Sequence, residues 1–137
     1  KAQGLDGIAI TEHDNKHYSY KVKEMVEQYF NNQTLIIPGQ ELDMGAVHIV
    51  ELYLPGDVTF RFIAHAGYPY VEDLSRYIND SIYGIELMDP KTDKRRIREL
   101  AGKHGLLLLT NSDAHRLSDI GQYYNEIDIE ELCARAR

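Results

Sequence analysis

Short apolar runs and amphipathic segments alternate along most of the chain. The apolar runs predict strands at residues 8–11, 35–38, 46–54, 60–64, 84–88, 106–109 and 123–127. Apolar positions at helical spacing predict helices at residues 17–30, 70–78, 91–103 and 129–135. Because helices alternate with most of the strands, the pattern predicts an α/β domain with a largely parallel sheet.

Ligand-capable side chains follow directly after several of these strands. They are His13, Glu41, His65, Asp113 and His115. Ligand sites of α/β sheets lie beyond the carboxyl ends of the strands, so these side chains are expected at one edge of the sheet. His48 lies within the strand predicted at 46–54 and is expected on the face opposite its neighbours Val47 and Ile49.

Three of these positions also have ordinary structural interpretations. Asp113 and His115 are two residues apart, so in extended backbone their side chains point to the same side and can converge on one ion or on two neighbouring ions. The alternative is that Asp113 caps the segment that follows and that His115 is a surface turn residue. Glu41 is likewise either a ligand or a solvated loop residue.

The overall composition limits the class of protein. At 137 residues, with 43% hydrophobic and 27% charged residues, the chain has the size and composition of one globular domain, spanning 1–137. A formal net charge of −7 argues against a large nucleic-acid interface, which requires clustered Lys and Arg. No apolar run approaches the ~20 residues of a membrane helix and no signal peptide opens the chain, so we expect a cytoplasmic protein without membrane contact.

Imidazole and carboxylate side chains, without cysteine, form the expected metal-ligand set: His13, Glu41, His48, His65, Asp113 and His115. Such hard-to-borderline ligands are typical of a hydrolytic zinc, manganese or iron centre. We expect two or three divalent ions, with a metal-bridging hydroxide as nucleophile and the phosphoryl oxygens of a phosphate ester clamped by the metals. Glu41 is the candidate carboxylate that bridges two ions.

Five motifs, in the same order along the chain, resemble those of the PHP family, the polymerase and histidinol phosphatase domains. Residues 4–14 are similar to its second motif, which usually ends in T-D-H. Residues 38–41 resemble the third motif, G-x-E, and residues 47–49 resemble the following H-I-L segment. Residues 64–67 resemble A-H-P-G, and residues 111–115 resemble the closing G-S-D-A-H.

The resemblance implies a distorted seven-stranded (β/α) barrel of PHP type with a trinuclear metal site. It implies that Glu41 bridges two ions, one held also by Asp113 and the other by His48 and His65. The third ion would take His13 and His115, and the expected catalytic residues are Glu41, Asp113 and His65. Proteins of this family hydrolyse phosphate esters, from histidinol phosphate and nucleoside bisphosphates to nucleic-acid ends.

The chain also departs from the family pattern. The family's first motif, H-x-H, is absent, so the barrel is expected to be incomplete at its N-terminus, with its first strand and first metal motif missing. Deleting a central strand would expose apolar edges on both neighbours, which favours a missing segment over a smaller barrel. A second missing segment is expected between residues 50 and 62, because a helix normally separates these motifs. Ala66 replaces the usual Pro, and Glu12 replaces the usual Asp.

Candidates for holding the phosphate group are Arg116, beside the last motif, and Arg61 and Tyr68, which flank His65. Surface arginine is common, so each also has a structural interpretation. We therefore expect a metal-dependent phosphoesterase whose partner is a small phosphorylated metabolite or nucleotide. The alternative is a non-catalytic, metal-stabilised PHP module of a larger or nucleic-acid-processing protein. The sequence leaves the substrate's identity and the oligomeric state open.

Overall fold

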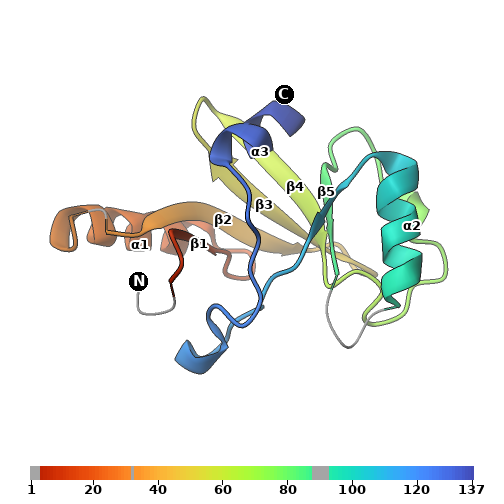
Figure 1. Ribbon diagram of the computed structural model, residues 1–137, viewed down its shortest axis with the longest axis horizontal. Helices are drawn as coiled ribbons and strands as arrows, with labels where there is room; N and C mark the ends of the chain where they lie inside the picture. The colour runs from red at the N-terminus through yellow and green to blue at the C-terminus, as the bar shows by residue number, and fades with distance from the viewer. Residues whose placement is uncertain (1–3, 32, 88–92) are drawn as a thin grey trace.

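A computed structural model of the protein describes residues 4–31, 33–87 and 93–137. These residues form one sheet and three α-helices, with two short 3-10 helices at Leu74–Tyr77 and Leu117–Asp119 (Figure 1). The strands are β1 (Gly7–Ile10), β2 (Leu35–Asp43), β3 (His48–Leu54), β4 (Val58–Ala64), β5 (Gly84–Glu86) and β6 (Leu107–Leu109). The α-helices are α1 (Lys16–Tyr29), α2 (Lys94–His104) and α3 (Ile129–Arg135).

The sheet is mixed, and its strands lie side by side in chain order from β1 to β6. β1 is parallel to β2, and β4, β5 and β6 are parallel to one another. β2, β3 and β4 are antiparallel, because the turns between them are too short for the crossover that a parallel pair requires. The prediction of a largely parallel sheet is therefore wrong for the middle of the sheet.

The predicted seven-stranded (β/α) barrel is also wrong. The described residues form a six-stranded, curled sheet, a half-barrel with β1 at one end and β6 at the other (Figure 1). A closed barrel requires every strand to pair on both sides, whereas within the described ranges β1 pairs with β2 alone and β6 with β5 alone. The stretch 50–62, where a missing segment was expected, forms a continuous hairpin of β3 and β4.

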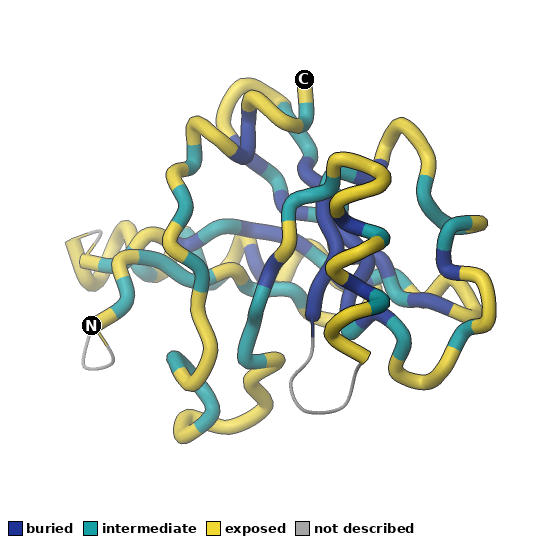
Figure 2. Tube along the Cα trace, turned by 45° about the vertical axis from the view of Figure 1, so that its right-hand side comes forward, coloured by how far each residue is buried: buried dark blue, intermediate teal, exposed yellow. Residues whose placement is uncertain are grey.

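Side chains of alternate residues along the strands build one core on each face of the sheet. On one face, Ile63 and Ile85 pack with Ile97 of α2, and all three are fully buried. On the other face, Phe60 and Phe62 pack with Leu132 and Cys133 of α3. Figure 2 shows the buried residues concentrated along the central strands, under these helices.

α1 is fixed to β2 through a buried hydroxyl. Ser19 is fully buried, and its Oγ accepts a 3.0 Å hydrogen bond from the backbone N–H of Gly39. A Cβ at Gly39 would lie 2.3 Å from the backbone oxygen of Glu51 on β3, so this position has no room for a side chain. Tyr20 of α1 also stacks on Tyr53 of β3, with ring centroids 6.0 Å apart.

Two predicted elements differ in the structure. The helix predicted at 70–78 is reduced to the 3-10 helix Leu74–Tyr77, because the guanidinium of Arg96 binds the carbonyls of Val71 and Glu72 and holds that segment in an irregular conformation. The strand predicted at 123–127 is not formed, and the segment is joined to the residues after β6 through the side chain of Asn125. The predictions for residues 88, 91 and 92 fall outside the described residues.

The other helices begin and end close to the predicted residues. α3 spans 129–135 as predicted, and α1 begins and ends one residue before the predicted 17–30. In the described part of the chain, every helix is too short or too polar to cross a membrane.

Candidate metal centre

Glu41 lies inside a strand and not in a loop after one. β2 continues past the predicted end at Pro38 to Asp43, and Glu41 pairs there with Val50 of β3. Strand alternation places the Glu41 side chain on the face of the sheet that carries Val50 and Phe62. Glu41 is buried, with 8% exposure, and a buried carboxylate requires charged or hydrogen-bonding partners.

His13 is held against Glu41 by the backbone. The N–H of Glu41 donates to the carbonyl of Glu12 at 3.0 Å, and the N–H of Asp14 donates to the carbonyl of Glu41 at 2.9 Å. These two bonds form an isolated parallel bridge between His13 and Glu41. As a result, Nδ1 of His13 lies 3.1 Å from Oε2 of Glu41.

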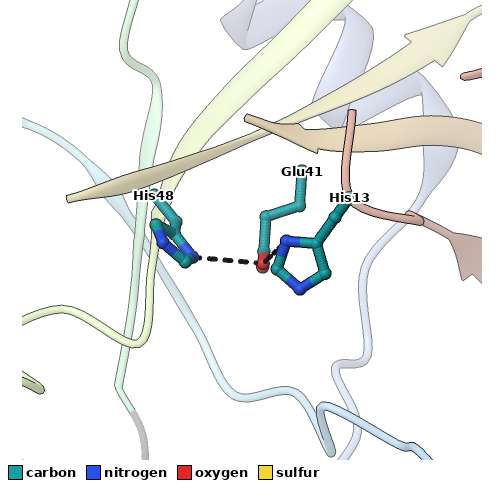
Figure 3. A group of neighbouring side chains, drawn as sticks. All are labelled: His13, Glu41 and His48. Atoms are coloured by element: carbon teal, nitrogen blue, oxygen red, sulfur yellow. Dashed lines mark hydrogen bonds and ion pairs between the residues drawn. The ribbon is translucent and has the colours of Figure 1, made fainter. Parts of the chain in front are cut away.

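His48, the first residue of β3, completes a compact group with these two residues (Figure 3). Its Nδ1 lies 3.2 Å from the same oxygen, Oε2 of Glu41. The ligand atoms of His13, Glu41 and His48 all lie within 4.8 Å of one another. Nε2 of His48 lies 3.7 Å from Oδ1 of Asp43, which supports the ring from its other side.

His65 brings a third imidazole to the edge of this group. It follows β4 directly, and its Nδ1 lies 2.8 Å from the backbone carbonyl of Tyr68. Because a carbonyl only accepts, Nδ1 carries the proton and Nε2 of the neutral ring carries a lone pair. Nε2 lies 3.2 Å from Nδ1 of His48, so this lone pair points towards the group.

The arrangement around Nδ1 of His48 fits a cation better than a hydrogen-bond network. Oε2 of Glu41 and Nε2 of His65 both carry lone pairs, and each lies 3.2 Å from this nitrogen. A ring nitrogen has one proton at most, so it cannot fully satisfy two acceptors. Two imidazoles and one carboxylate are also the protein ligands of catalytic zinc sites that keep a position for water.

Glu86 is a buried carboxylate outside the ligand set predicted from the sequence. It is the last residue of β5, is 4% exposed, and lies on the sheet face shared by Gly84 and the Phe62 core. The pKa of Glu86 is raised to about 7, mainly by burial; the backbone hydrogen bond and the charge of His65 lower it, and the carboxylates of Asp113 and Glu41 make smaller contributions that raise it. The strand predicted at 84–88 places Glu86 in its interior, so the strand-end signal that selected His65 was not available for it.

Asp113 and His115 follow β6 in an exposed loop. Asp113 has a left-handed backbone, φ 48°, and its carboxylate influences Glu86 as described above. His115 Nδ1 lies 2.8 Å from the carbonyl of Asp113, which leaves its Nε2 with a lone pair. In the described ranges, the compact ligand group contains neither residue, so the structure does not bring all the predicted ligands together.

The side chain of Asn125 anchors the start of this loop. Its Oδ1 accepts from the N–H of Thr110 at 2.8 Å, and its Nδ2 donates to the carbonyl of Thr110 at 2.9 Å. Nδ2 also lies 2.7 Å from Oδ1 of Asn111. In the segment 123–127, where a strand was predicted, the side-chain amide of Asn125 thus binds the backbone of Thr110, the residue directly after β6.

The three residues predicted to bind phosphate lie in different environments. Arg61 alternates to the face opposite Glu41, where its Nε donates to Glu51 at 2.7 Å. Tyr68 is half-exposed beside His65, to which it offers its carbonyl. Arg116 follows His115, and its side chain is 81% exposed, with Nε 3.7 Å from Asp119. Of the two candidate arginines, Arg116 is the one that adjoins a predicted ligand, His115, and has an exposed side chain.

Comparison with known protein families gives a match for the C-terminal part of the chain. Residues 91–137 match the family described as PHP-associated, and this segment contains α2, β6 and α3 together with Asp113 and His115. The match supports the relationship to the PHP family that the motifs predict, over about a third of the chain. Comparisons with curated proteins and with solved structures gave no match.

Proposed function

We propose that the protein hydrolyses phosphate esters with the help of divalent metal ions held by His13, Glu41 and His48. The observation that carries the proposal is the convergence of these three ligand atoms within 4.8 Å of one another, with the Nε2 lone pair of His65 beside them. The PHP-associated match of residues 91–137 supports a PHP-family context for this proposal. A bound divalent ion supplies Lewis acidity, which activates water and stabilises charge on the phosphoryl oxygens.

Each residue of the site has a role that follows from its position. Glu41, fixed within β2 and buried, supplies negative charge at the centre of the group. His13 and His48 present their Nδ1 atoms from opposite sides of that carboxylate (Figure 3). We propose Asp113 and His115, in the exposed loop after β6, as further donors; the Asp113 carbonyl orients the ring of His115.

A small phosphorylated molecule is the proposed substrate class. A net charge of −7 disfavours a long polyanion, whereas one accessible guanidinium is enough for a single phosphate group. Arg116 is the proposed phosphate ligand, because its side chain is exposed and adjoins His115. Its ion pair with Asp119 is long and solvent-screened, so exchange for a phosphate costs little.

The activity is tested by measuring inorganic phosphate released from a panel of phosphomonoesters, with Mn²⁺ or Zn²⁺ added. We expect hydrolysis that a chelator abolishes and that Glu41→Gln reduces by about a hundredfold or more, because the substitution removes the central charge of the site. Arg116→Ala is expected to raise KM with a smaller change in kcat, because a ground-state phosphate contact is lost.

Asp57→Asn is the matched control for the charge change at Glu41. Asp57 is exposed in the turn between β3 and β4, far along the hairpin from His48, and asparagine tolerates its positive φ of 57°. The control should retain wild-type activity. Absence of hydrolysis across the panel, or equal activity in wild type and Glu41→Gln, would overturn the proposed function.

A metal-stabilised module without catalysis is the second candidate. It is favoured by one observation, that the compact group contains three of the six predicted ligands. Under this alternative, Mn²⁺ raises the midpoint of thermal unfolding of the wild type, but not of Glu41→Gln, while no phosphate ester is hydrolysed. Under the proposed function, the same stabilisation is accompanied by turnover.

A further inference from the structure

We propose that Glu86 is a positioning residue that holds His65 in the orientation it needs for metal binding. The inference rests on the proposed function, because it concerns the same site. Glu86 was not among the expected ligands, and in the described residues it does not belong to the compact group of His13, Glu41 and His48. Its contacts are instead with the backbone that carries His65.

Two hydrogen bonds connect Glu86 to the turn after β4. The carboxylate Oε2 of Glu86 accepts from the backbone N–H of His65 at 3.1 Å, and the Glu86 carbonyl accepts from the N–H of Ala66 at 3.2 Å. Both donors belong to residues just beyond the end of β4. A single residue of β5 therefore satisfies two successive N–H groups that leave the sheet ladder at this point.

This turn requires outside support because His65 has an unfavourable backbone conformation. Its φ of 32° is rare for a residue with a side chain, and such conformations persist where the surroundings fix them. The same conformation directs the ring so that Nδ1 meets the Tyr68 carbonyl and Nε2 meets His48. If the His65 N–H loses its acceptor, the backbone is freed to relax and the ring is expected to move away from His48.

Burial makes the Glu86 side chain a rigid support. Its exposure is 4%, whereas His65 is only half-buried, so Glu86 is the fixed partner of the pair. Residues that orient metal ligands in this way typically change metal affinity by about 10- to 100-fold when they are substituted.

A double-mutant cycle for Mn²⁺ affinity, measured by isothermal titration calorimetry, tests the inference. Glu86→Ala is expected to weaken binding by about tenfold or more, since the acceptor is lost. Glu86→Gln keeps an oxygen acceptor of the same shape, so it should restore most of the affinity. In a His65→Ala background, Glu86→Ala should cause little further loss, because the ligand that it positions is already absent.

A general loss of stability would give a different pattern. Leu132→Ala, in the α3 core at the far end of the β3–β4 hairpin, serves as the control that lowers stability without contacting the site. It should leave Mn²⁺ affinity unchanged. An equal loss from Glu86→Ala with and without His65, or a failure of Glu86→Gln to restore affinity, would overturn the positioning role.

Hydrogen exchange of the His65 backbone amide, measured by NMR in the presence of a chelator, separates this inference from the proposed function. The amide should be protected in wild type and in Glu86→Gln and should exchange faster in Glu86→Ala. Unchanged protection in Glu86→Ala would refute the inference, whatever the metal data show. If wild type binds no Mn²⁺, the proposed function fails, and the exchange result still decides the role of Glu86.

Discussion

The ionisation of one residue, Glu86, should make the stability of the metal-free protein depend on pH. Burial raises its pKa from 4.5 to about 7, so between these values the folded state keeps a proton that the unfolded chain has released. The contribution of Glu86 should therefore lower the free energy of unfolding as pH rises from 4.5 to 7, by up to about 3 kcal/mol in total. Above pH 7 the ionisation of Glu86 should no longer change the free energy of unfolding with pH.

Denaturant unfolding with a chelator present, at several values between pH 5 and 8, checks this dependence. The informative quantity is the difference between wild type and Glu86→Gln, because the histidines titrate in both proteins. The difference should move in favour of Glu86→Gln as pH rises. A difference that stays constant with pH would show that the Glu86 carboxyl has an ordinary pKa.

At the same scale, physical chemistry explains why the sequence indicated the histidines and Glu41 but not Glu86. His13, Glu41, His48 and His65 were selected as candidates because imidazole and carboxylate groups at or near the ends of apolar strands are conspicuous in a sequence. Glu86 was missed because a single acidic residue in a short apolar strand is usually solvated, and its burial follows only from the packing of β4 and β6 on both sides.

At the scale of elements, the packing of β2 against β3 and α1 makes a clear prediction for Gly39. Glu51's carbonyl lies 2.3 Å from the position of an added Cβ, so Gly39→Ala should push β3 away or break the bond to Ser19. The expected loss of stability is about 1–3 kcal/mol, measured by denaturant unfolding.

Gly102→Ala is the matched control for this substitution. Gly102 lies within α2, and an added Cβ there meets no atom within 4 Å. The same chemical change should therefore stabilise the protein by roughly 0.5–1 kcal/mol, because alanine is the better helix former. Equal effects at the two positions would contradict the close approach of β2 and β3.

Local sequence patterns predicted well those helices and strands whose conformation depends mainly on their own residues. α1, α3 and most strands follow from periodicity, because each depends mainly on its own residues. The segments 70–78 and 123–127 failed because distant side chains decide them, Arg96 in the first case and the pairing of Asn125 with Thr110 in the second. Neither contact can be read from the local sequence.

At the scale of the whole molecule, the failed barrel prediction has the same cause. Closure of a barrel depends on pairing between its first and last strands, which no local pattern determines. The half-barrel nevertheless brings Glu86 close enough to Glu41 and Asp113 for both of their carboxylates to raise the pKa of Glu86. A domain of net charge −7 that gathers carboxylates and imidazoles in this way is suited to attract divalent cations.

Anomalous X-ray scattering from crystals soaked in Mn²⁺ tests the central claim most directly, because it locates the ion without reference to activity. We expect an anomalous peak at about 2.0–2.3 Å from Nδ1 of His13, Nδ1 of His48 and the Glu41 carboxylate, distances typical of such metal–ligand bonds. The peak should be absent from crystals of Glu41→Gln. A peak elsewhere on the surface, or none at these three residues in the wild type, would contradict metal binding at His13, Glu41 and His48.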